Sequence, residues 1–358
     1  MIGCARFAAL GLTLALLSAC GGGVSQPRLA GRPPQDVTAY VVNEGSDTVT
    51  AFSTRTGKVI KTIKVGARPS AIAITPDGRT AYVVNYDSGT VTPISTATQR
   101  AGKAIKVGDG PAGVAITPDN KTAYVVNNDS GTVTPISTAT QRAGRAITIA
   151  PDPAGFGIAI TPDGTTAYIT NDQQTGTVTP VNLATRVVGT PIKAGAWPRA
   201  IAITPDGRTA YITTDYGNDS GTVTPINLAT GLPGRPINPV KDDLPMGIAI
   251  SPDGAAIYVT SYLPSDSTVP TQSLGSMTAI GAASGRPAMR ISAGYNPEAL
   301  AITPDGTTAY VVNRYGFDGP STVTPIQIAT GTREKPIPVG SGPVAIALTP
   351  RADQGGKK

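Results

Sequence analysis

One phrase recurs along the whole chain and constrains its fold more than any other feature. Its fullest copy runs from Ala71 to Asn85 and reads AIAITPDGRTAYVVN. A supersecondary unit repeated with a period of about 40 to 50 residues is typical of a solenoid or a propeller. Its step of Ile or Leu followed by Thr-Pro or Ser-Pro occurs seven times, at Thr75, Thr117, Thr161, Thr204, Ser251, Thr303 and Thr349.

Each repeat predicts a four-stranded β-blade. Two short strands flank the Thr-Pro-Asp-Gly turn, in which Pro presets one turn position and Gly accepts a left-handed backbone. Two further strands are expected over residues 89–94 and 104–107 in the copy that starts at Ala71. No stretch inside the repeats has the spacing of apolar residues that a helix requires, so the fold is expected to be all-β.

The two ends of the repeat region complement each other. The region begins with a second-strand phrase, Thr38 to Asn43, and it ends with a first-strand phrase, Val344 to Pro350. A C-terminal strand that pairs with the N-terminal strands would close a ring and remove its open edges. The sequence therefore predicts a seven-bladed β-propeller over residues 38–350, closed by strands from both termini, with a C-terminal innermost strand.

Three phrases carry a resemblance to a known family. PDGRTAYVVN at 76–85, PDNKTAYVVN at 118–127 and TTAYITN at 165–171 resemble the YVTN family of β-propeller repeats. The resemblance covers residues 38–350 and implies an exported bacterial protein, of a kind whose molecular function is mostly unassigned. The repeat Asn is replaced by Thr214 in the fifth unit and by Ser261 in the sixth.

The N-terminus predicts export and lipid anchoring. A short apolar run, Phe7 to Leu17, follows one positive charge and leads into Leu-Ser-Ala-Cys20, which resembles the lipobox of bacterial lipoproteins. We expect residues 1–19 to be cleaved, Cys20 to carry the lipid, and residues 20–37 to be a flexible tether. The alternative is an ordinary cleaved signal with an incidental Cys. The expected location is the outer face of the cell membrane or the outer membrane, and residues 351–358 are expected to form a disordered basic tail.

The meander of strands predicts two chemically different faces. We call the face with the Thr-Pro-Asp-Gly turns the turn face, and the face with the blade-to-blade connections the connection face. Assigned to these faces by sequence, the turn face has fourteen bases against seven acids, whereas the connection face has fourteen acids against four bases. The turn face, which includes Arg100, Arg142 and Arg145, is expected to face an anionic lipid surface.

Five tyrosines outside the repeat position, the one Trp and two of the four Phe fall in connection-face loops. Variable aromatic loops on a rigid scaffold are typical of binding sites. The alternative is that these rings only cover loop backbone. The candidate binding face consists of Tyr86, Phe156, Trp197, Arg199, Tyr216, Tyr262, Tyr295, Glu298, Arg314, Tyr315 and Phe317.

The composition excludes several catalytic chemistries. The chain contains no His, which rules out Ser-His-Asp and Cys-His nucleophiles and His-ligated metals. No cofactor or metal site is expected. An enzyme would depend on carboxylates close to the channel mouth, with or without Ca²⁺ or Mg²⁺, and the candidates are Asp109, Asp152, Asp242, Asp243 and Glu298.

Three functions are compatible with these patterns. The main hypothesis is a monomeric, non-catalytic, lipid-anchored module that binds an envelope protein or glycan through the connection face. The first alternative is a His-free hydrolase, lactonase or lyase that uses the mouth carboxylates. The second alternative is nucleic-acid binding through the basic turn face, which export and the placement of the aromatic residues disfavour.

Overall fold

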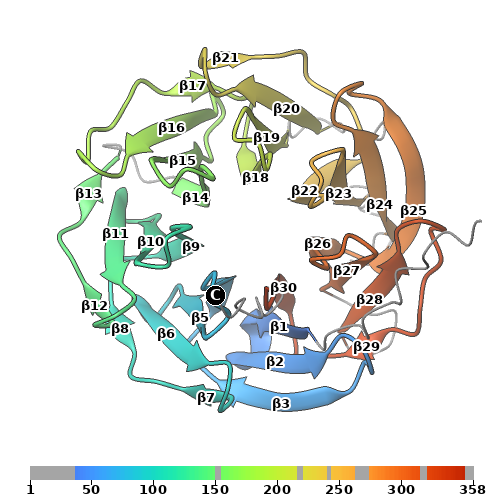
Figure 1. Cartoon of the computed structure of the whole chain (residues 1–358), viewed down its shortest axis with the longest axis horizontal. Helices are drawn as coiled ribbons and strands as arrows, with labels where there is room; N and C mark the ends of the chain where they lie inside the picture. The colour runs from blue at the N-terminus through green and yellow to red at the C-terminus, as the bar shows by residue number, and fades with distance from the viewer. Residues whose placement is uncertain are drawn as a thin grey trace, which may run out of the picture. The chain divides into compact units, whose positions relative to one another are not determined.

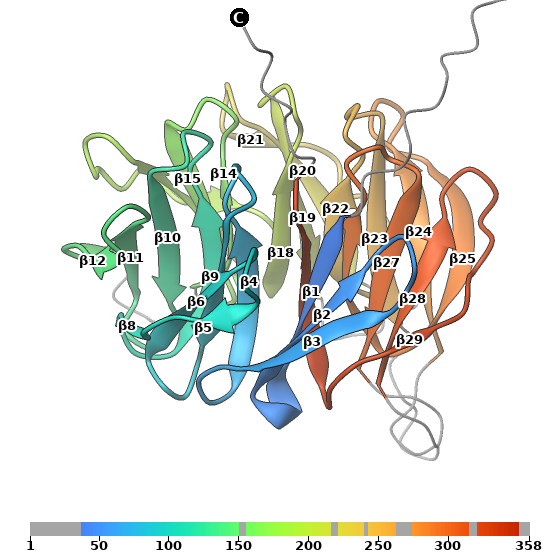
Figure 2. The ribbon, with the colours of Figure 1, turned by 60° about the horizontal axis from the view of Figure 1, so that its bottom comes forward.

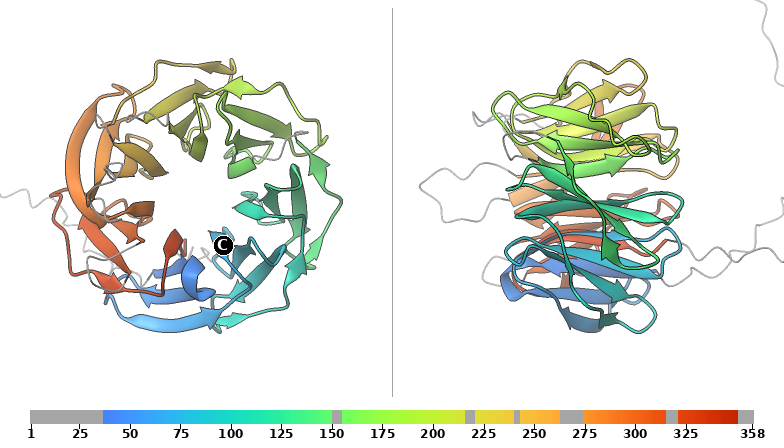
Figure 3. Two further views of the ribbon diagram at one scale, coloured as in Figure 1. Left: turned by 180° about the vertical axis from the view of Figure 1, so that it is seen from behind. Right: turned by 90° about the vertical axis from the view of Figure 1, so that its left-hand side faces the viewer.

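The chain folds into a ring of seven antiparallel sheets (Figure 1). The structure is a computed structural model and describes residues 37–149, 155–215, 221–239, 243–262, 274–314 and 321–350. Seen edge-on, each blade spans the ring from one face to the other (Figure 3). The predicted seven-bladed, all-β propeller is confirmed. In the described ranges no helix is long and apolar enough to cross a membrane.

Each blade has four layers, counted outward from the central axis. The innermost strands are β4 (Pro69–Ile74), β9 (Pro111–Ile116), β14 (Gly155–Ile160), β18 (Pro198–Ile203), β22 (Leu244–Ile250), β26 (Pro297–Ile302) and β30 (Pro343–Leu348). The second strands are β1 (Thr38–Asn43), β5 (Thr80–Asn85), β10 (Thr122–Asn127), β15 (Thr166–Asn171), β19 (Thr209–Thr214), β23 (Ala256–Tyr262) and β27 (Thr308–Asn313).

The outer two layers complete the blades. The third strands are β2 (Thr48–Ser53), β6 (Thr90–Ser95), β11 (Thr132–Ser137), β16 (Thr177–Asn182), β20 (Thr222–Asn227), β24 (Leu274–Gly281) and β28 (Thr322–Gln327). The outer strands are β3 (Val59–Lys64), β7 (Arg100–Ala101), β8 (Ile105–Lys106), β12 (Arg142–Ala143), β13 (Ile147–Thr148), β17 (Ile192–Lys193), β21 (Leu232–Pro233), β25 (Pro287–Tyr295) and β29 (Ile337–Pro338). A short 3₁₀ helix, η1 (Glu44–Ser46), follows β1.

The ring closes through its first and last strands. β30 is the innermost strand of the first blade and pairs antiparallel with β1, with Tyr40 opposite Ala347. The backbone N–H of Thr349 donates to the carbonyl of Thr38 at 2.9 Å, so the start of β1 and the end of β30 lie together on the turn face. The predicted closure is confirmed, and Figure 2 shows β1 and β2 between the last blades and the second blade.

The core lies between blades and not in one central cluster. Seven apolar clusters each join two neighbouring blades, and each contains one repeat tyrosine, as Tyr310 of β27 packs on Phe52 of β2. The Tyr310 hydroxyl donates to the Thr54 carbonyl at 2.9 Å, and burial raises its pKa to about 12. The repeat tyrosines therefore join the blades and are remote from the channel.

Proline in the third strand interrupts the outer strand. Opposite Pro93 the outer layer divides into β7 and β8, and the N–H of Gly102 donates to the Pro93 carbonyl at 2.7 Å. Where Ala51 and Ala279 occupy this position, β3 and β25 are continuous. Proline cannot donate to the ladder, which explains the loss of pairing.

The Thr-Pro-Asp-Gly turn is stabilised by hydrogen bonds among its own residues. In the fourth blade the Thr161 hydroxyl donates to the Asp163 carboxylate at 2.5 Å, and the N–H of Thr165 donates to the same oxygen at 3.0 Å. Gly164 adopts φ 71°, which only glycine accepts without strain. The hydroxyl and the backbone N–H hold the pKa of Asp163 below its usual value. The turn aspartates are thus structural.

Candidate functional site

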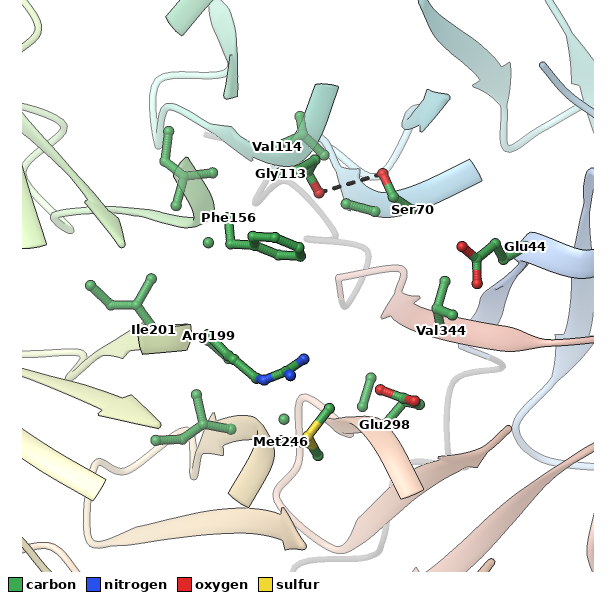
Figure 4. A pocket seen from close by; sticks show the side chains of 18 of the residues that line it. Glu44, Ser70, Gly113, Val114, Phe156, Arg199, Ile201, Met246, Glu298 and Val344 are labelled. Carbon is green, nitrogen blue, oxygen red and sulfur yellow. Dashed lines mark hydrogen bonds between the residues drawn. The ribbon is translucent and has the colours of Figure 1, made fainter. Parts of the chain in front are cut away.

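A cavity of about 530 Å³ occupies the channel at the connection face (Figure 4). Residues of all seven innermost strands line it. The mouth is formed by polar side chains that follow the second strands or precede the innermost ones, and these are Glu44, Arg68, Tyr86 and Arg314.

A β-bulge near the start of every innermost strand supplies the main ring of cavity residues. In β26, Pro297 pairs with Asn313 and Ala299 pairs with Val312, so Glu298 is left out of the ladder. A bulge redirects such an extra residue, here toward the channel. The ring consists of Ser70, Ala112, Phe156, Arg199, Met246, Glu298 and Val344, and every member lines the cavity.

Glu44 links two of the mouth arginines. One carboxylate oxygen accepts from Arg68 Nε at 3.0 Å, and the other accepts from Arg314 Nη2 at 2.5 Å. Arg314 Nη1 also contacts Glu298 Oε1 at 3.4 Å. A continuous chain of charge pairs therefore runs from the mouth to Glu298.

Glu298 is a carboxylate in a desolvated position. Its side chain is 18% exposed, and burial raises its pKa above the ordinary value, while Arg314 opposes that shift. A raised carboxylate pKa inside a cleft is typical of a group that exchanges protons during catalysis.

Arg199 has unused hydrogen-bonding capacity. Its nearest carboxylate is Asp215, at 3.7 Å from Nη2, which is longer than a hydrogen bond. Its buried Nε has no hydrogen-bond partner among the described residues. In Figure 4 the Arg199 side chain extends into the cavity toward Met246 and Glu298. The side chain is 38% exposed, so the guanidinium end, whose Nη2 is too far from Asp215 for a hydrogen bond, is suited to an oxygen of a ligand.

Tyr86 and Arg68 brace one side of the mouth. The Arg68 guanidinium lies 4.8 Å from the centre of the Tyr86 ring, and the Tyr86 hydroxyl donates to Asp129 at 2.7 Å. Burial raises the pKa of Tyr86, and the bond to Asp129 acts in the same direction. Tyr86 therefore stays protonated and holds Arg68 at the rim.

The structure brings together only part of the predicted binding face. Tyr86, Phe156, Arg199, Glu298 and Arg314 line the cavity. Trp197 is 40% exposed and does not line it, and Tyr295 lies at the end of the outer strand β25. Burial raises the pKa of Tyr262, and the negative charge of Glu298 raises it further. Tyr216, Tyr315 and Phe317 lie outside the described residues.

Three of the five predicted mouth carboxylates lie among the described residues, and these three do not converge. Of them, Glu298 lines the cavity, whereas Asp109 is exposed outside it. Asp243 is buried within the sixth blade, where its carboxylate accepts from Arg290 at 2.9 Å and from Ser261 at 3.2 Å. Asp152 and Asp242 lie outside the described residues. In the part of the chain that the structure describes, no three Asp, Glu, Cys or His side chains form a group that could hold a metal ion.

The sequence predicted only part of the ring of bulge residues, because the innermost strands were treated as a uniform scaffold. Glu44, Ser70, Ala112, Met246 and Val344 were not among the candidates. The signal was present: one position near the start of each inner strand varies among Ser, Ala, Phe, Arg, Met, Glu and Val, while the positions after it stay small or aliphatic. Such variation at a fixed register in a repeat marks the residues that the scaffold leaves free.

A family model described as "Lactonase, 7-bladed beta-propeller" matches residues 24–143. This range includes the three N-terminal strands of the first blade, the whole second blade and most of the third. A search of curated proteins gave no match.

Solved structures share the fold. A hydrazine synthase chain of Kuenenia stuttgartiensis is 24% identical with a TM-score of 0.69, over 77% of this chain and 88% of that one. A Desulfotomaculum acetoxidans protein of unknown function is 21% identical with a TM-score of 0.71, over 87% and 99%. A Bacteroides uniformis protein described provisionally as a 6-phosphogluconolactonase is 20% identical with a TM-score of 0.69, over 88% and 100%. At such identities these likenesses show the fold alone.

The main functional hypothesis from the sequence, a non-catalytic binding module, is wrong. The lactonase family match points to a hydrolase, and it agrees with the first alternative. The hypothesis assumed that a catalytic site would show carboxylates at a spacing that recurs in the repeats. The cavity instead combines single residues from different blades. The finer resemblance to the YVTN family and the lipoprotein signal stay predictions.

Proposed function

We propose that the protein hydrolyses a lactone or a related ester in the connection-face cavity. The observation that carries this proposal is the presence of Glu298, with its raised pKa, and the partly exposed guanidinium of Arg199 in one cavity of a propeller whose residues 24–143 match a lactonase family model. The Bacteroides uniformis protein described provisionally as a 6-phosphogluconolactonase, which shares this fold, is consistent with it.

Glu298 is the general base in this proposal. It takes a proton from a water molecule as the water oxygen attacks the carbonyl carbon of the lactone. The ring C–O bond then breaks, the ring oxygen receives the proton from Glu298, and the product is a hydroxy acid. Burial makes Glu298 a stronger base than an exposed glutamate, while Arg314 keeps its charged form accessible.

Arg199 stabilises the negative charge that develops on the carbonyl oxygen. Its side chain lines the cavity, and its Nη2 lies 3.7 Å from the Asp215 carboxylate, beyond hydrogen-bond distance. A donor that is already oriented acts without reorganisation as the charge appears, and removal of one such donor typically lowers kcat by 10²–10³-fold. No histidine is needed for either role.

Arg314 and Glu44 are positioning residues. Arg314 contacts Glu298 through one nitrogen and Glu44 through the other, so the Glu298 carboxylate is held from the rim. Glu44 offsets part of the positive charge that Arg314 and Arg68 would otherwise impose on the site.

The test is hydrolysis of a small lactone panel, δ-valerolactone, δ-decalactone and glucono-δ-lactone, by the full chain in a pH-stat. We expect Glu298→Gln to lower kcat/KM for the best substrate by about 10²–10⁴-fold. Arg199→Gln should lower kcat by about 10²–10³-fold. Asp109→Asn, an exposed carboxylate outside the cavity, is the matched control and should leave the rate unchanged. Wild-type rates in Glu298→Gln, or no turnover of any panel member, would contradict the proposal.

A further inference from the structure

The cavity has a polar mouth and an apolar depth. Below the bulge ring, a second ring of side chains from the innermost strands faces the same space, and it is entirely aliphatic: Val114, Ile158, Ile201, Ile248 and Leu300. Within the bulge ring itself, Phe156, Met246 and Val344 add apolar surface (Figure 4). The charged groups are restricted to Arg199, Glu298 and the mouth residues Glu44, Arg68 and Arg314.

Phe156 presents its ring to this space. The Phe156 side chain is 40% exposed, whereas the aliphatic residues of the described innermost strands are partly or fully buried. An aromatic side chain exposed in a concave, apolar setting marks a surface that a ligand covers.

The depth of the cavity is poorly suited to a polyhydroxylated sugar. Among the described residues that line it, Ser70 and Tyr86 carry hydroxyl groups, and both already donate, Ser70 to the Pro111 carbonyl at 3.2 Å and Tyr86 at the mouth to Asp129 at 2.7 Å. Each sugar hydroxyl that enters and finds no partner loses its hydrogen bonds to water without replacement. A hydrocarbon chain has no such requirement.

We propose that the substrate is amphipathic: a lactone or ester that carries an unbranched hydrocarbon chain. Its carbonyl group lies between Arg199 and Glu298, and its chain packs against Phe156, Met246 and the aliphatic ring. This assignment rests on the proposed function for the reaction, but the ligand class can be measured by binding alone.

The first experiment measures binding without turnover. Butyrate, hexanoate, octanoate and gluconate share a carboxylate head that Arg199 can bind, and they differ in the rest of the molecule. Isothermal titration of the full chain should give an affinity that rises roughly fourfold per buried methylene along the linear series. Gluconate should bind more weakly than hexanoate, which has the same number of carbons. Equal affinity across the linear series, or tighter binding of gluconate, would overturn the assignment.

A pair of matched variants locates the chain. Phe156→Ser and Trp197→Ser each remove an aromatic side chain that is 40% exposed on the connection face, but only Phe156 lines the cavity. Phe156→Ser should weaken octanoate binding at least fivefold and leave butyrate binding nearly unchanged. Trp197→Ser should change neither. An equal effect of both variants on octanoate would place the chain elsewhere and overturn the assignment.

The second experiment separates this inference from the reaction. If glucono-δ-lactone is hydrolysed with a higher kcat/KM than δ-decalactone, the protein is a lactone hydrolase and the amphipathic substrate is wrong. If octanoate binds with the expected chain-length dependence while no lactone is turned over, the ligand class stands and the proposed reaction fails.

Discussion

Glu44 accepts a hydrogen bond from Arg314 at 2.5 Å, although 270 residues separate them in the chain. Glu44 follows β1 of the first blade, and Arg314 follows β27 of the seventh. The contact therefore spans the junction where the ring closes. Because Arg314 also contacts Glu298, closure of the ring and the arrangement of the proposed base are parts of one structure.

Replacement of Glu44 should move the pH profile of the proposed reaction. The negative charge of Glu44 contributes to the raised pKa of Glu298. Glu44→Gln removes that charge and leaves Arg314 less neutralised, so both changes favour the charged form of Glu298. We expect the acid limb of kcat/KM against pH to shift to lower pH.

The control for this shift is Asp87→Asn. Asp87 pairs with Arg68 at 3.5 Å on the exposed side of the mouth, and it does not line the cavity with Glu298. The same change in charge at Asp87 should leave the acid limb in place. A shift to higher pH in Glu44→Gln would contradict the electrostatic role of Glu44.

Glu298→Gln should stabilise the fold while it removes activity. A group whose pKa is raised in the folded protein contributes stability that is present below its unfolded pKa and is lost as pH rises through its folded value. The folded pKa of Glu298 is raised by burial, so its charge is unfavourable to folding at neutral pH. The variant should have the higher Tm at pH 7, and the difference should shrink as the pH falls below about 4.3, the usual glutamate pKa. Thermal melts from pH 3.5 to 8 measure this, and a lower Tm at pH 7 would show that the pair with Arg314 outweighs burial.

Asp243 should be a structural residue. Its side chain is 1% exposed and accepts hydrogen bonds from Arg290 and Ser261, the residue that replaces the repeat Asn in the sixth blade. Asp243→Ala removes a buried acceptor and leaves Arg290, which is half-exposed, without its carboxylate, so it should lower the free energy of unfolding by about 1–3 kcal/mol. Urea titration measures the change, and Asp109→Ala should stay within about 0.5 kcal/mol of wild type. A change of less than about 0.5 kcal/mol in Asp243→Ala would mean that solvent reaches the pair of Asp243 and Arg290.

Blade number, ring closure and the divided outer strands could be predicted because each depends on local chemistry. The period sets the blades, the unmatched strands at 38–43 and 344–350 set the closure, and the missing N–H of Pro93 sets the division of its outer strand. These signals lie within one repeat or at the ends of the repeat region, so they need no knowledge of how blades face one another.

The site could not be predicted in the same way. Glu298 faces the channel because of the bulge between Pro297 and Ala299, and a bulge is a property of the register between two strands. Asp243 appeared to be a mouth carboxylate because its partner Arg290 lies on the outer strand of the same blade, 47 residues away.

Membrane docking through the turn face remains a prediction, and the described residues allow a sharp test of it. Arg100, Arg142 and Arg145 are exposed there. Each well-placed base gains about 1 kcal/mol near an anionic lipid surface, so the triple Gln variant should bind vesicles with 30% phosphatidylserine roughly 100-fold more weakly at low salt. The control replaces Lys61, Lys64 and Lys106, which are exposed on the outer strands β3 and β8, and it changes the net charge equally. Vesicle binding is measured by sedimentation. An equal loss of binding in the two variants would indicate that net charge alone attracts the protein to the membrane, without a preferred orientation of the turn face.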